Sequence, residues 1–188
     1  IKIMKKIITS LMALSLIFGA SAQDGMKGTY LLGATQDITS TGWSDIQITP
    51  SVGYFVSDNI AVGLGFSLAN TNDNGDKATV GENKTSTIEF SPFLRYYMDD
   101  KLFLVAGIGL TNGTSTMSMD GVDDVETKMS AFGFNVGAGL SLMWGERVAI
   151  EPAFMIGTSS SSSEMGGTST DGASGLNAGF QIGLSLRM

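Results

Sequence analysis

The stretch Ile60-Ala61-Val62-Gly63-Leu64-Gly65-Phe66-Ser67-Leu68 alternates between large apolar and small side chains. Its even-numbered positions are all large and apolar, and its odd-numbered positions are all small. The same alternation recurs over 130–144 and 176–188. Because successive side chains of a strand point to opposite faces, this period of two predicts β-strands rather than helices.

The small face of these strands distinguishes between two all-β folds. A soluble barrel or sandwich packs its large apolar residues inside and shows polar ones to water. Here the second face carries mostly Gly, Ser, Ala and Asn, which suit a narrow lumen better than a solvated surface. The alternating runs also reach the ~9–11 residues that a tilted membrane strand needs. The pattern therefore predicts that the apolar side chains face outward, toward lipid.

The order of the runs and connections predicts the topology. We expect strands near 26–36, 46–56, 60–70, 85–98, 102–113, 128–144, 148–158 and 175–188. Short connections alternate with long polar ones, which we expect at 37–45, 71–84, 114–127 and 159–174. This layout predicts an all-β, eight-stranded antiparallel up-and-down transmembrane β-barrel with short periplasmic turns and long extracellular loops. The Ser run over 159–163 is interpreted as part of a flexible external loop.

The composition excludes several classes of function. The 188 residues carry 11 basic and 18 acidic side chains, a formal net charge of −7. This sign argues against a nucleic-acid-binding protein. The chain has no His and no Cys, so it lacks the commonest general base and all thiolate ligands. We therefore predict no enzyme activity, no cofactor and no metal site.

The N-terminal residues have the layout of a targeting signal. Lys2, Lys5 and Lys6 precede an apolar run over 7–18, and Ala20-Ser21-Ala22 follows it. Basic, apolar and small residues in this order are typical of a secretory signal peptide. We expect a signal peptide over 1–22 and a barrel domain over 23–188. The alternative of a membrane anchor is disfavoured because the run is shorter than the ~20 residues of a spanning helix.

An internal repeat carries a family resemblance. Pro50-Ser51-Val52-Gly53-Tyr54-Phe55-Val56-Ser57-Asp58-Asn59 aligns without gaps on Pro92-Phe93-Leu94-Arg95-Tyr96-Tyr97-Met98-Asp99-Asp100-Lys101. With the Gly-alternating strands that follow them, these stretches resemble the small outer-membrane β-barrel proteins of the OmpX and OmpA-barrel type, especially those of Bacteroidetes. The resemblance implies a Gram-negative outer membrane and contacts with membrane lipid and lipopolysaccharide. Because proline donates no ladder hydrogen bond, we also expect local bulges at Pro50 and Pro92.

The last strand carries Gln181-x-Gly183-x-x-Leu186-x-Met188. This resembles the polar-x-Gly-x-x-apolar-x-apolar signal that the barrel assembly machinery reads, which implies that machinery as a partner during biogenesis. The family usually ends in an aromatic residue, and Met188 departs from that pattern.

Outward aromatic residues are expected at both ends of the strands, as membrane interfaces require. The predicted girdles are Tyr54, Tyr96 and Trp144 near the short turns, and Phe66, Phe90 and Phe132 toward the long loops.

Inward positions predict a closed lumen. Four inward residues two positions from a short turn are expected to form a plug at the periplasmic end: Phe55, Tyr97, Phe103 and Met143. The predicted lumen charge cluster consists of Glu89, Arg95, Glu151 and Arg187. Because an ionised group in a narrow lumen needs a partner, we expect Glu151 to pair with Arg187 on the adjacent strand. These features predict at most a low conductance.

Together these features predict an integral outer-membrane barrel with a structural, surface-interaction or minor porin-like role. Acidic residues dominate the expected external loops, which disfavours anionic ligands and leaves a surface ligand or a partner protein as candidates. Two alternatives remain open: a barrel-scaffold enzyme acting on lipid, and a secreted soluble β-barrel binding protein.

Overall fold

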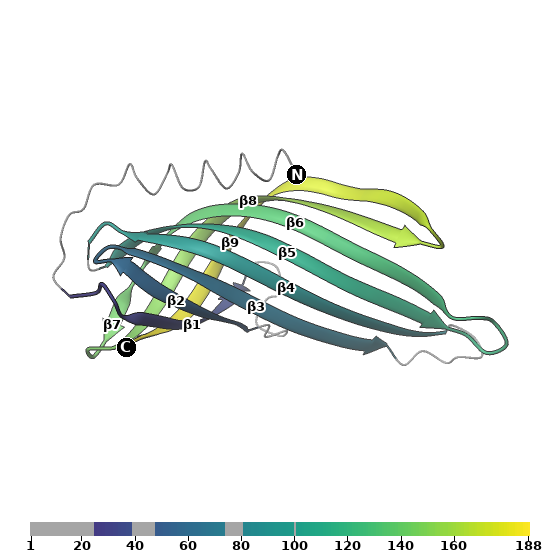
Figure 1. The fold of residues 1–188 in the computed structure, drawn as a ribbon, viewed down its shortest axis with the longest axis horizontal. Coiled ribbons are helices and arrows are strands. Elements are labelled where there is room, and N and C mark those ends of the chain that lie inside the picture. The colour runs from purple at the N-terminus through teal and green to yellow at the C-terminus, as the bar shows by residue number, and fades with distance from the viewer. Residues whose placement is uncertain (1–24, 39–47, 74–80, 100) are drawn as a thin grey trace.

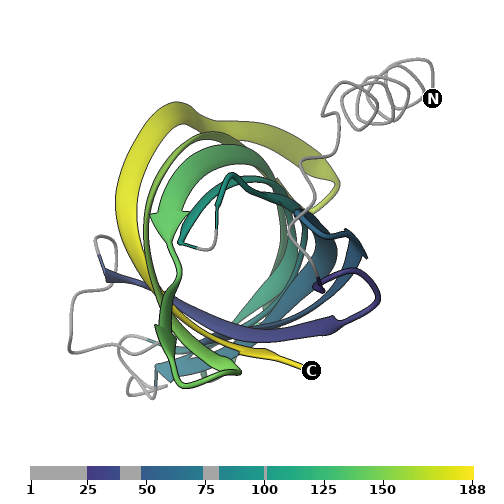
Figure 2. The same ribbon diagram turned by 90° about the vertical axis from the view of Figure 1, so that its left-hand side faces the viewer.

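The computed structural model describes residues 25–38, 48–73, 81–99 and 101–188. Within these residues it has nine antiparallel strands: β1 (Tyr30–Asp37), β2 (Thr49–Ser57), β3 (Ile60–Asp73), β4 (Glu82–Tyr97), β5 (Leu102–Ser118), β6 (Val125–Leu140), β7 (Leu142–Trp144), β8 (Val148–Met165) and β9 (Thr168–Arg187). The strands pair in the order β6-β5-β4-β3-β2-β1-β9-β8-β7, and a further pairing of β6 with β8 closes the ring (Figures 1 and 2). No helix in the described part of the chain is long and apolar enough to cross a membrane.

Strands β6 and β7 together occupy the place of a single strand in the barrel. Both pair with β8 in a continuous register, with Gly139 opposite Ala153 and Leu142 opposite Ile150. The break between them falls at Ser141, whose N–H donates instead to the Lys101 carbonyl oxygen at 2.5 Å. The nine strands therefore make a ring with the predicted all-β, antiparallel, up-and-down topology.

The three prolines interrupt the ladder on one side only. On the paired side the register continues, with Pro50 opposite Ala34, Pro92 opposite Leu64, and Pro152 opposite Ile182. On the other side, the β4–β5 pairing omits Pro92, and the β6–β8 pairing ends before Pro152. A missing N–H explains the interruption. The bulges expected at Pro50 and Pro92 are wrong, since the register shifts lie near Phe55 and Ser160 instead.

Most of the expected long loops are strand. Strand β5 continues to Ser118 and β6 begins at Val125, while β8 and β9 are separated only by Gly166 and Gly167, both with positive φ. The Ser run over 159–163 lies in β8, so its interpretation as a flexible loop is wrong. Short polar side chains in alternating positions can pair as well as apolar ones, because the ladder uses the backbone. Residues 39–45 and 74–80 of the remaining expected loops, the first two residues of the expected strand 46–56 and the predicted signal peptide over 1–22 lie outside the described residues.

The ring has two ends. We call the end with the turns at 58–59, 98–101 and 145–147 the short-turn end, and the end with the connections at 119–124 and 166–167 the hairpin end. The C-terminus lies at the short-turn end, on the left of Figure 1.

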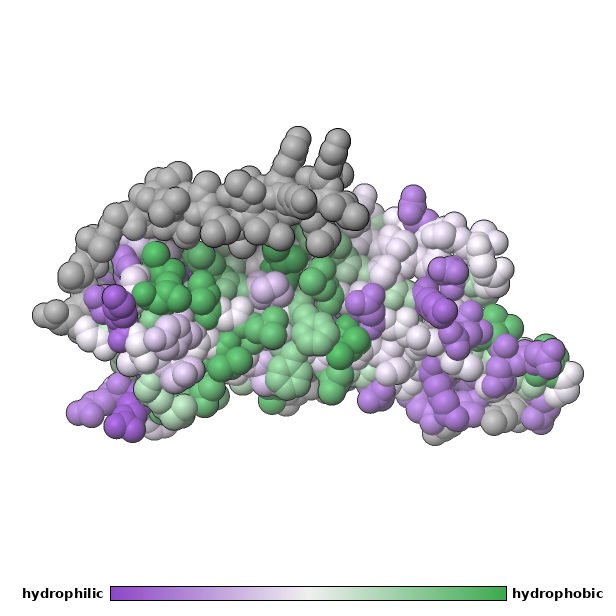
Figure 3. Space-filling model, viewed as in Figure 1, coloured by the Kyte–Doolittle hydropathy of each residue, from purple (hydrophilic) through white to green (hydrophobic). Residues whose placement is uncertain are grey.

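From β3 to β6, even-numbered residues face outward. The pairings Phe66 with Phe90, Phe90 with Leu110, and Leu110 with Phe132 keep this parity from strand to strand. These four side chains are all exposed. On the face shown in Figure 3, apolar residues gather in a band between hydrophilic residues at the two ends. An outward apolar band flanked by polar ends is the surface of a transmembrane barrel.

Two inward glycines show why the inner face is small. A Cβ on Gly63 would collide with the Phe93 ring, and a Cβ on Gly139 would collide with the Phe103 ring. Glycine at these positions leaves room for aromatic side chains from neighbouring strands to fill the lumen.

Candidate functional site: the sealed end of the barrel

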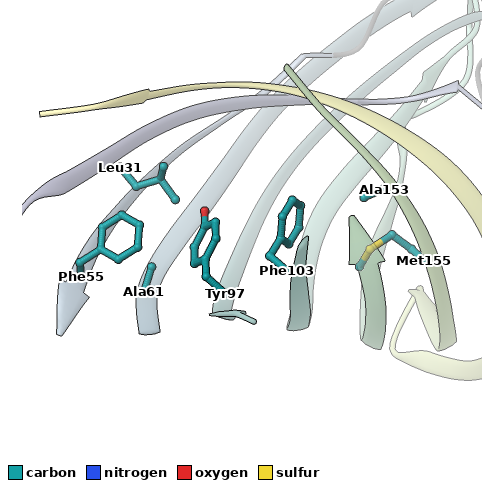
Figure 4. Close-up of a cluster of buried hydrophobic side chains, with 7 residues drawn as sticks. All are labelled: Leu31, Phe55, Ala61, Tyr97, Phe103, Ala153 and Met155. Atoms are coloured by element: carbon teal, nitrogen blue, oxygen red, sulfur yellow. The ribbon is translucent and has the colours of Figure 1, made fainter. Parts of the chain in front are cut away.

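An apolar cluster fills the lumen near the short-turn end. The buried side chains are Leu31, Phe55, Ala61, Tyr97, Phe103, Ala153 and Met155 (Figure 4). Ring centroids of Phe55 and Tyr97 are 5.4 Å apart, and those of Tyr97 and Phe103 are 5.7 Å apart. At no more than 1% exposure each, these three rings leave no room for water between them.

The structure thus places three of the four expected plug residues together, and Met143 outside the cluster. Met143 pairs with Ala149 and is 39% exposed. Strands of a closed barrel are tilted and staggered, so residues equally far from their turns do not lie at equal depth. For this reason the expectation for Met143 is wrong.

A buried ion pair lies beside the aromatic rings. Arg95 Nη1 donates to Glu151 Oε2 at 2.5 Å, and the two residues are 8% and 2% exposed. The Ser141 hydroxyl donates to the other carboxylate oxygen of Glu151 at 3.3 Å. Buried charges need such partners because desolvation otherwise costs several kcal/mol per ion.

The expected pair of Glu151 with Arg187 is wrong. Arg187 Nη2 donates instead to the Ser141 hydroxyl at 2.8 Å, so Ser141 links the two groups. The residue opposite Glu151 on β9 is Gly183, four positions from Arg187. At ~3.4 Å per residue this offset separates the two backbones by roughly 14 Å along the strand. Sequence reasoning missed Ser141, although its inward parity opposite Glu151 was a usable signal.

Both arginines lie over aromatic rings. The Arg95 guanidinium carbon is 4.8 Å from the centroid of the Phe103 ring and 5.4 Å from that of Phe93. The Arg187 carbon is 5.0 Å from the Tyr97 centroid. A cation over a ring face is attracted by the ring quadrupole, most strongly where water is excluded. The charged and aromatic residues therefore form one packed unit.

Residues 25–29 cover the apolar cluster at the short-turn end of the lumen. Met26 packs against the cluster, and its sulfur accepts a hydrogen bond from Arg187 Nη1 at 3.4 Å. The backbone N–H of Lys27 donates to Asp58, and that of Gly28 donates to the Phe55 carbonyl oxygen. The sequence predicted that the first strand begins near residue 26, whereas in the structure β1 begins at Tyr30 and residues 26–29 precede it.

Glu89 has a hydrogen-bond partner of its own. Its carboxylate accepts a hydrogen bond from the Ser91 hydroxyl at 2.7 Å. Both residues line a cavity of about 160 Å³ together with Asn135 and Gln181, and Arg95 and Glu151 line the same cavity. Three residues of the predicted charge cluster are therefore linked by hydrogen bonds through Ser141, whereas Glu89 shares their cavity and is bonded to Ser91.

The predicted girdle residues lie on the outer face. Tyr54 and Trp144 are exposed, and Tyr96 is half-buried. The rings of Tyr30 and Tyr54 pack edge to face, with their centroids 5.4 Å apart. Phe66, Phe90 and Phe132 lie in one cross-strand row with Leu110, closer to the hairpin end.

The residues of the predicted assembly signal lie on β9 and just beyond it. Gln181 lines the lumen, and Leu186 pairs with Leu32 of β1. Gly183 is buried against Thr35 and Glu151, which leaves little room for a side chain. The backbone of Met188 exchanges two hydrogen bonds with Tyr30, at 2.7 and 3.0 Å, so it extends the pairing of β9 with the start of β1.

Among the described residues, no group of three or more Asp, Glu, His or Cys side chains is arranged to hold a metal ion.

Comparisons with known proteins agree with this architecture. The model of the family described as "Outer membrane protein beta-barrel domain" matches residues 9–187. No curated protein matches the sequence. The structure of Ail of Yersinia pestis in complex with the heparin analogue sucrose octasulfate is similar, with a TM-score of 0.50 and 10% identity over 87% of this chain and 100% of Ail.

Two further solved structures are similar at lower scores. The N-terminal β-barrel domain of Pseudomonas aeruginosa OprF has a TM-score of 0.46 and 10% identity over 86% of this chain and 98% of that domain. Neisserial surface protein A has a TM-score of 0.43 and 14% identity over 88% of this chain and 100% of its own. Because the family model covers nearly the whole chain, this protein belongs to the outer membrane protein beta-barrel domain family and lies in the outer membrane of a Gram-negative bacterium.

Proposed function

We propose that this protein is a non-catalytic outer-membrane barrel, closed to permeation at its periplasmic end, which presents a polar structure at the cell surface. The short-turn end faces the periplasm in this proposal. The hairpin end, where polar parts of the strands extend beyond the apolar band, faces outward, because the larger part outside the membrane is usually the extracellular one. A secreted soluble barrel does not fit the family or the outward apolar band.

The packed lumen is the observation that carries the proposal. Phe55, Tyr97 and Phe103 fill the interior, and the neutralised pair of Arg95 and Glu151 lies against them. An ion crossing this region would have to displace close-packed rings and give up its hydration. The cavity beside the ion pair is therefore a closed-ended pocket rather than part of a channel.

The chemistry of the chain supports a non-catalytic role. It has no His to act as base and no Cys nucleophile, and Glu151, the most buried carboxylate of the described residues, is already paired with Arg95. A lipid-modifying enzyme would need an activated nucleophile or a free acid–base group near the membrane.

Single-channel recording of the refolded protein in planar bilayers tests the seal. We expect the native protein to show no stable conductance and Phe103→Ala, alone and with Tyr97→Ala, to raise the frequency of openings. Phe132→Ala, which removes an outward ring, should leave the recordings unchanged. A large, stable pore in the native protein would overturn the proposal.

A further inference from the structure

The apolar band of the outer face stops well short of the hairpin end. On β5 and β6 its last outward residues are Leu110 and Phe132, and the next outward residues are Asn112 and Ser130. This step is the boundary of the lipid-facing band. Glu126 is six positions from Phe132 on β6, so at ~3.4 Å per residue the hairpin end lies roughly 20 Å beyond the boundary along the strand.

Apolar side chains reappear at the hairpin end. Five residues there are between 40% and 63% exposed, and we call them the apolar tip: Met117, Met119, Val122, Val125 and Met165. Met117 is the cross-strand partner of Val125, and Met165 pairs with Thr127, two positions further along β6. Figure 3 shows apolar residues among hydrophilic ones at this end, on the right of the view. Clustered apolar side chains that neither lipid nor the lumen covers are a common mark of a protein-binding surface.

A shallow groove of about 550 Å³ lies between the start of β6 and the turn that joins β8 to β9. Val125 and Met165 of the apolar tip line it, and so do Gly166 and Gly167. A Cβ on either glycine would have nothing within 4 Å, so this side of the groove is open. We call it the tip groove. Its shape and its two apolar side chains suit an extended segment of a partner.

The charge of the tip groove selects the partner. The charged residues that line it are Asp124, Glu126, Lys128 and Glu164. Around it, residues 119–128 and 162–168 together carry five acidic side chains and one basic side chain. A second copy of this chain, with a net charge of −7, is repelled by such a surface, whereas a basic segment is attracted to it.

We propose that the tip groove binds a basic polypeptide segment whose Lys or Arg residues alternate with apolar ones. The apolar side chains of the segment lie on Val125 and Met165, and its cationic groups reach Asp124 and Glu126. Methionine adapts its shape to different partners, so the groove accepts a class of sequences rather than one fold. As a site for partners outside the cell, it rests on the outward orientation of the hairpin end in the proposed function, but not on the state of the lumen.

Fluorescence anisotropy with the full-length protein in phosphatidylcholine nanodiscs tests the proposal. Three labelled peptides of equal length alternate lysine with leucine, lysine with serine, or glutamate with leucine, and empty discs give the background. We expect the lysine–leucine peptide to bind at least about ten-fold more tightly than the lysine–serine peptide, because burying one leucine side chain is worth that much. The glutamate–leucine peptide should not bind above background. Equal binding of any two peptides, or none above background, would overturn the proposal.

A matched pair of variants locates the site. Asp124→Asn with Glu126→Gln removes two charges from the tip groove. Asp73→Asn with Asp171→Asn removes the same charge from other strands at the hairpin end. We expect the first variant to lose about five-fold in affinity for the lysine–leucine peptide, as for two exposed ion pairs. The second should stay within about two-fold of native, because salt screens separated charges. Equal affinities of the two variants would overturn the proposal.

Val125→Ser with Met165→Ser provides a second test, since it removes the apolar part of the groove and leaves every charge in place. It should lose about ten-fold in affinity for the lysine–leucine peptide and bind the lysine–serine peptide as the native protein does. Native affinity for both peptides would overturn the proposal. If peptide binding fails while the barrel shows no conductance, this inference fails and the proposed function stands. If a large pore appears in a protein that binds the peptide at the tip groove, only the sealed-barrel proposal fails.

Discussion

The two halves of this barrel are built from the same alternating strands but are stabilised differently. Near the short-turn end, Phe55 and Tyr97 are no more than 1% exposed, and the outer face carries the apolar band. At the hairpin end, residues 168–178 of β9 are exposed on both faces. Side-chain packing and lipid contact hold the first half, whereas the second depends on the backbone ladder. The same strands can therefore continue from the membrane-embedded half into the polar half without a change of secondary structure.

The largest expected effect comes from breaking the ion pair of the packed half. Glu151→Ala leaves the Arg95 guanidinium buried without its partner, and we expect a loss of about 3–5 kcal/mol of unfolding free energy. Denaturant titration in lipid vesicles measures it. Glu164→Ala, on the same strand in the polar half, should change stability by less than ~0.5 kcal/mol.

The same titration applied to the double variant Arg95→Ala with Glu151→Ala sharpens this result. It should lose less than the sum of the two single variants, because no uncompensated charge remains. Additive losses would show that the two side chains act independently.

A charge placed on the outer face tests where the lipid-facing band lies. Val136 is an outward residue in the middle of β6, between Ala106 and Ile156 of the neighbouring strands. Val136→Arg should cost about 2–4 kcal/mol, as for an arginine near the bilayer midplane. Thr116→Arg, beyond the boundary on β5, should cost about 0–1 kcal/mol. Equal losses would contradict the proposed boundary.

Substitutions at two inward glycines, one in each half, test how tightly the interior of each half is packed. A Cβ on Gly139 would meet the Phe103 ring and Ala153, whereas nothing lies within 4 Å of one on Gly175. We expect Gly139→Val to cost about 1–3 kcal/mol through overpacking. Gly175→Val should be tolerated, and heat-modified mobility on gels reports whether each variant folds. Similar losses at both sites would mean that the two interiors are equally packed.

The smallest effect is expected in the turn between β4 and β5. The backbone N–H groups of Leu102 and Lys101 donate to the Asp99 carboxylate, at 2.6 and 2.8 Å, and lower the pKa of Asp99 below its usual value. A lowered pKa stabilises the fold above the unfolded-state pKa, and this contribution disappears as the pH falls through the folded-state value.

The stability difference between native protein and Asp99→Asn should therefore persist at neutral pH and vanish only in strong acid. Unfolding midpoints of both proteins, measured from neutral pH to strong acid, test this pH dependence. Asp123→Asn, in the connection of β5 and β6, serves as the control. A difference that does not change with pH would mean that the carboxylate charge has no role in the turn.

Local sequence patterns correctly predicted the apolar parts of the strands and the direction in which their side chains point. The alternation around Phe66 and Phe132 identified the strands and the side that faces lipid, and inward parity identified Phe55, Tyr97 and Phe103 as residues of the lumen. The polar strands were missed because Ser and Gly have low β-propensity, and a serine run such as 159–163 is usually a loop. Pairing with the neighbouring ladders overrides that preference.

The sequence by itself determined the apolar parts of the strands, their two faces and the membrane-facing band, because alternation is a property of each strand alone. The tertiary structure decided which inward residues meet. Glu151 pairs with Arg95 rather than Arg187, Met143 lies outside the packed cluster, and Met26 closes the short-turn end. These contacts depend on the tilt and stagger of the closed ring, which only the pairing of all strands together defines.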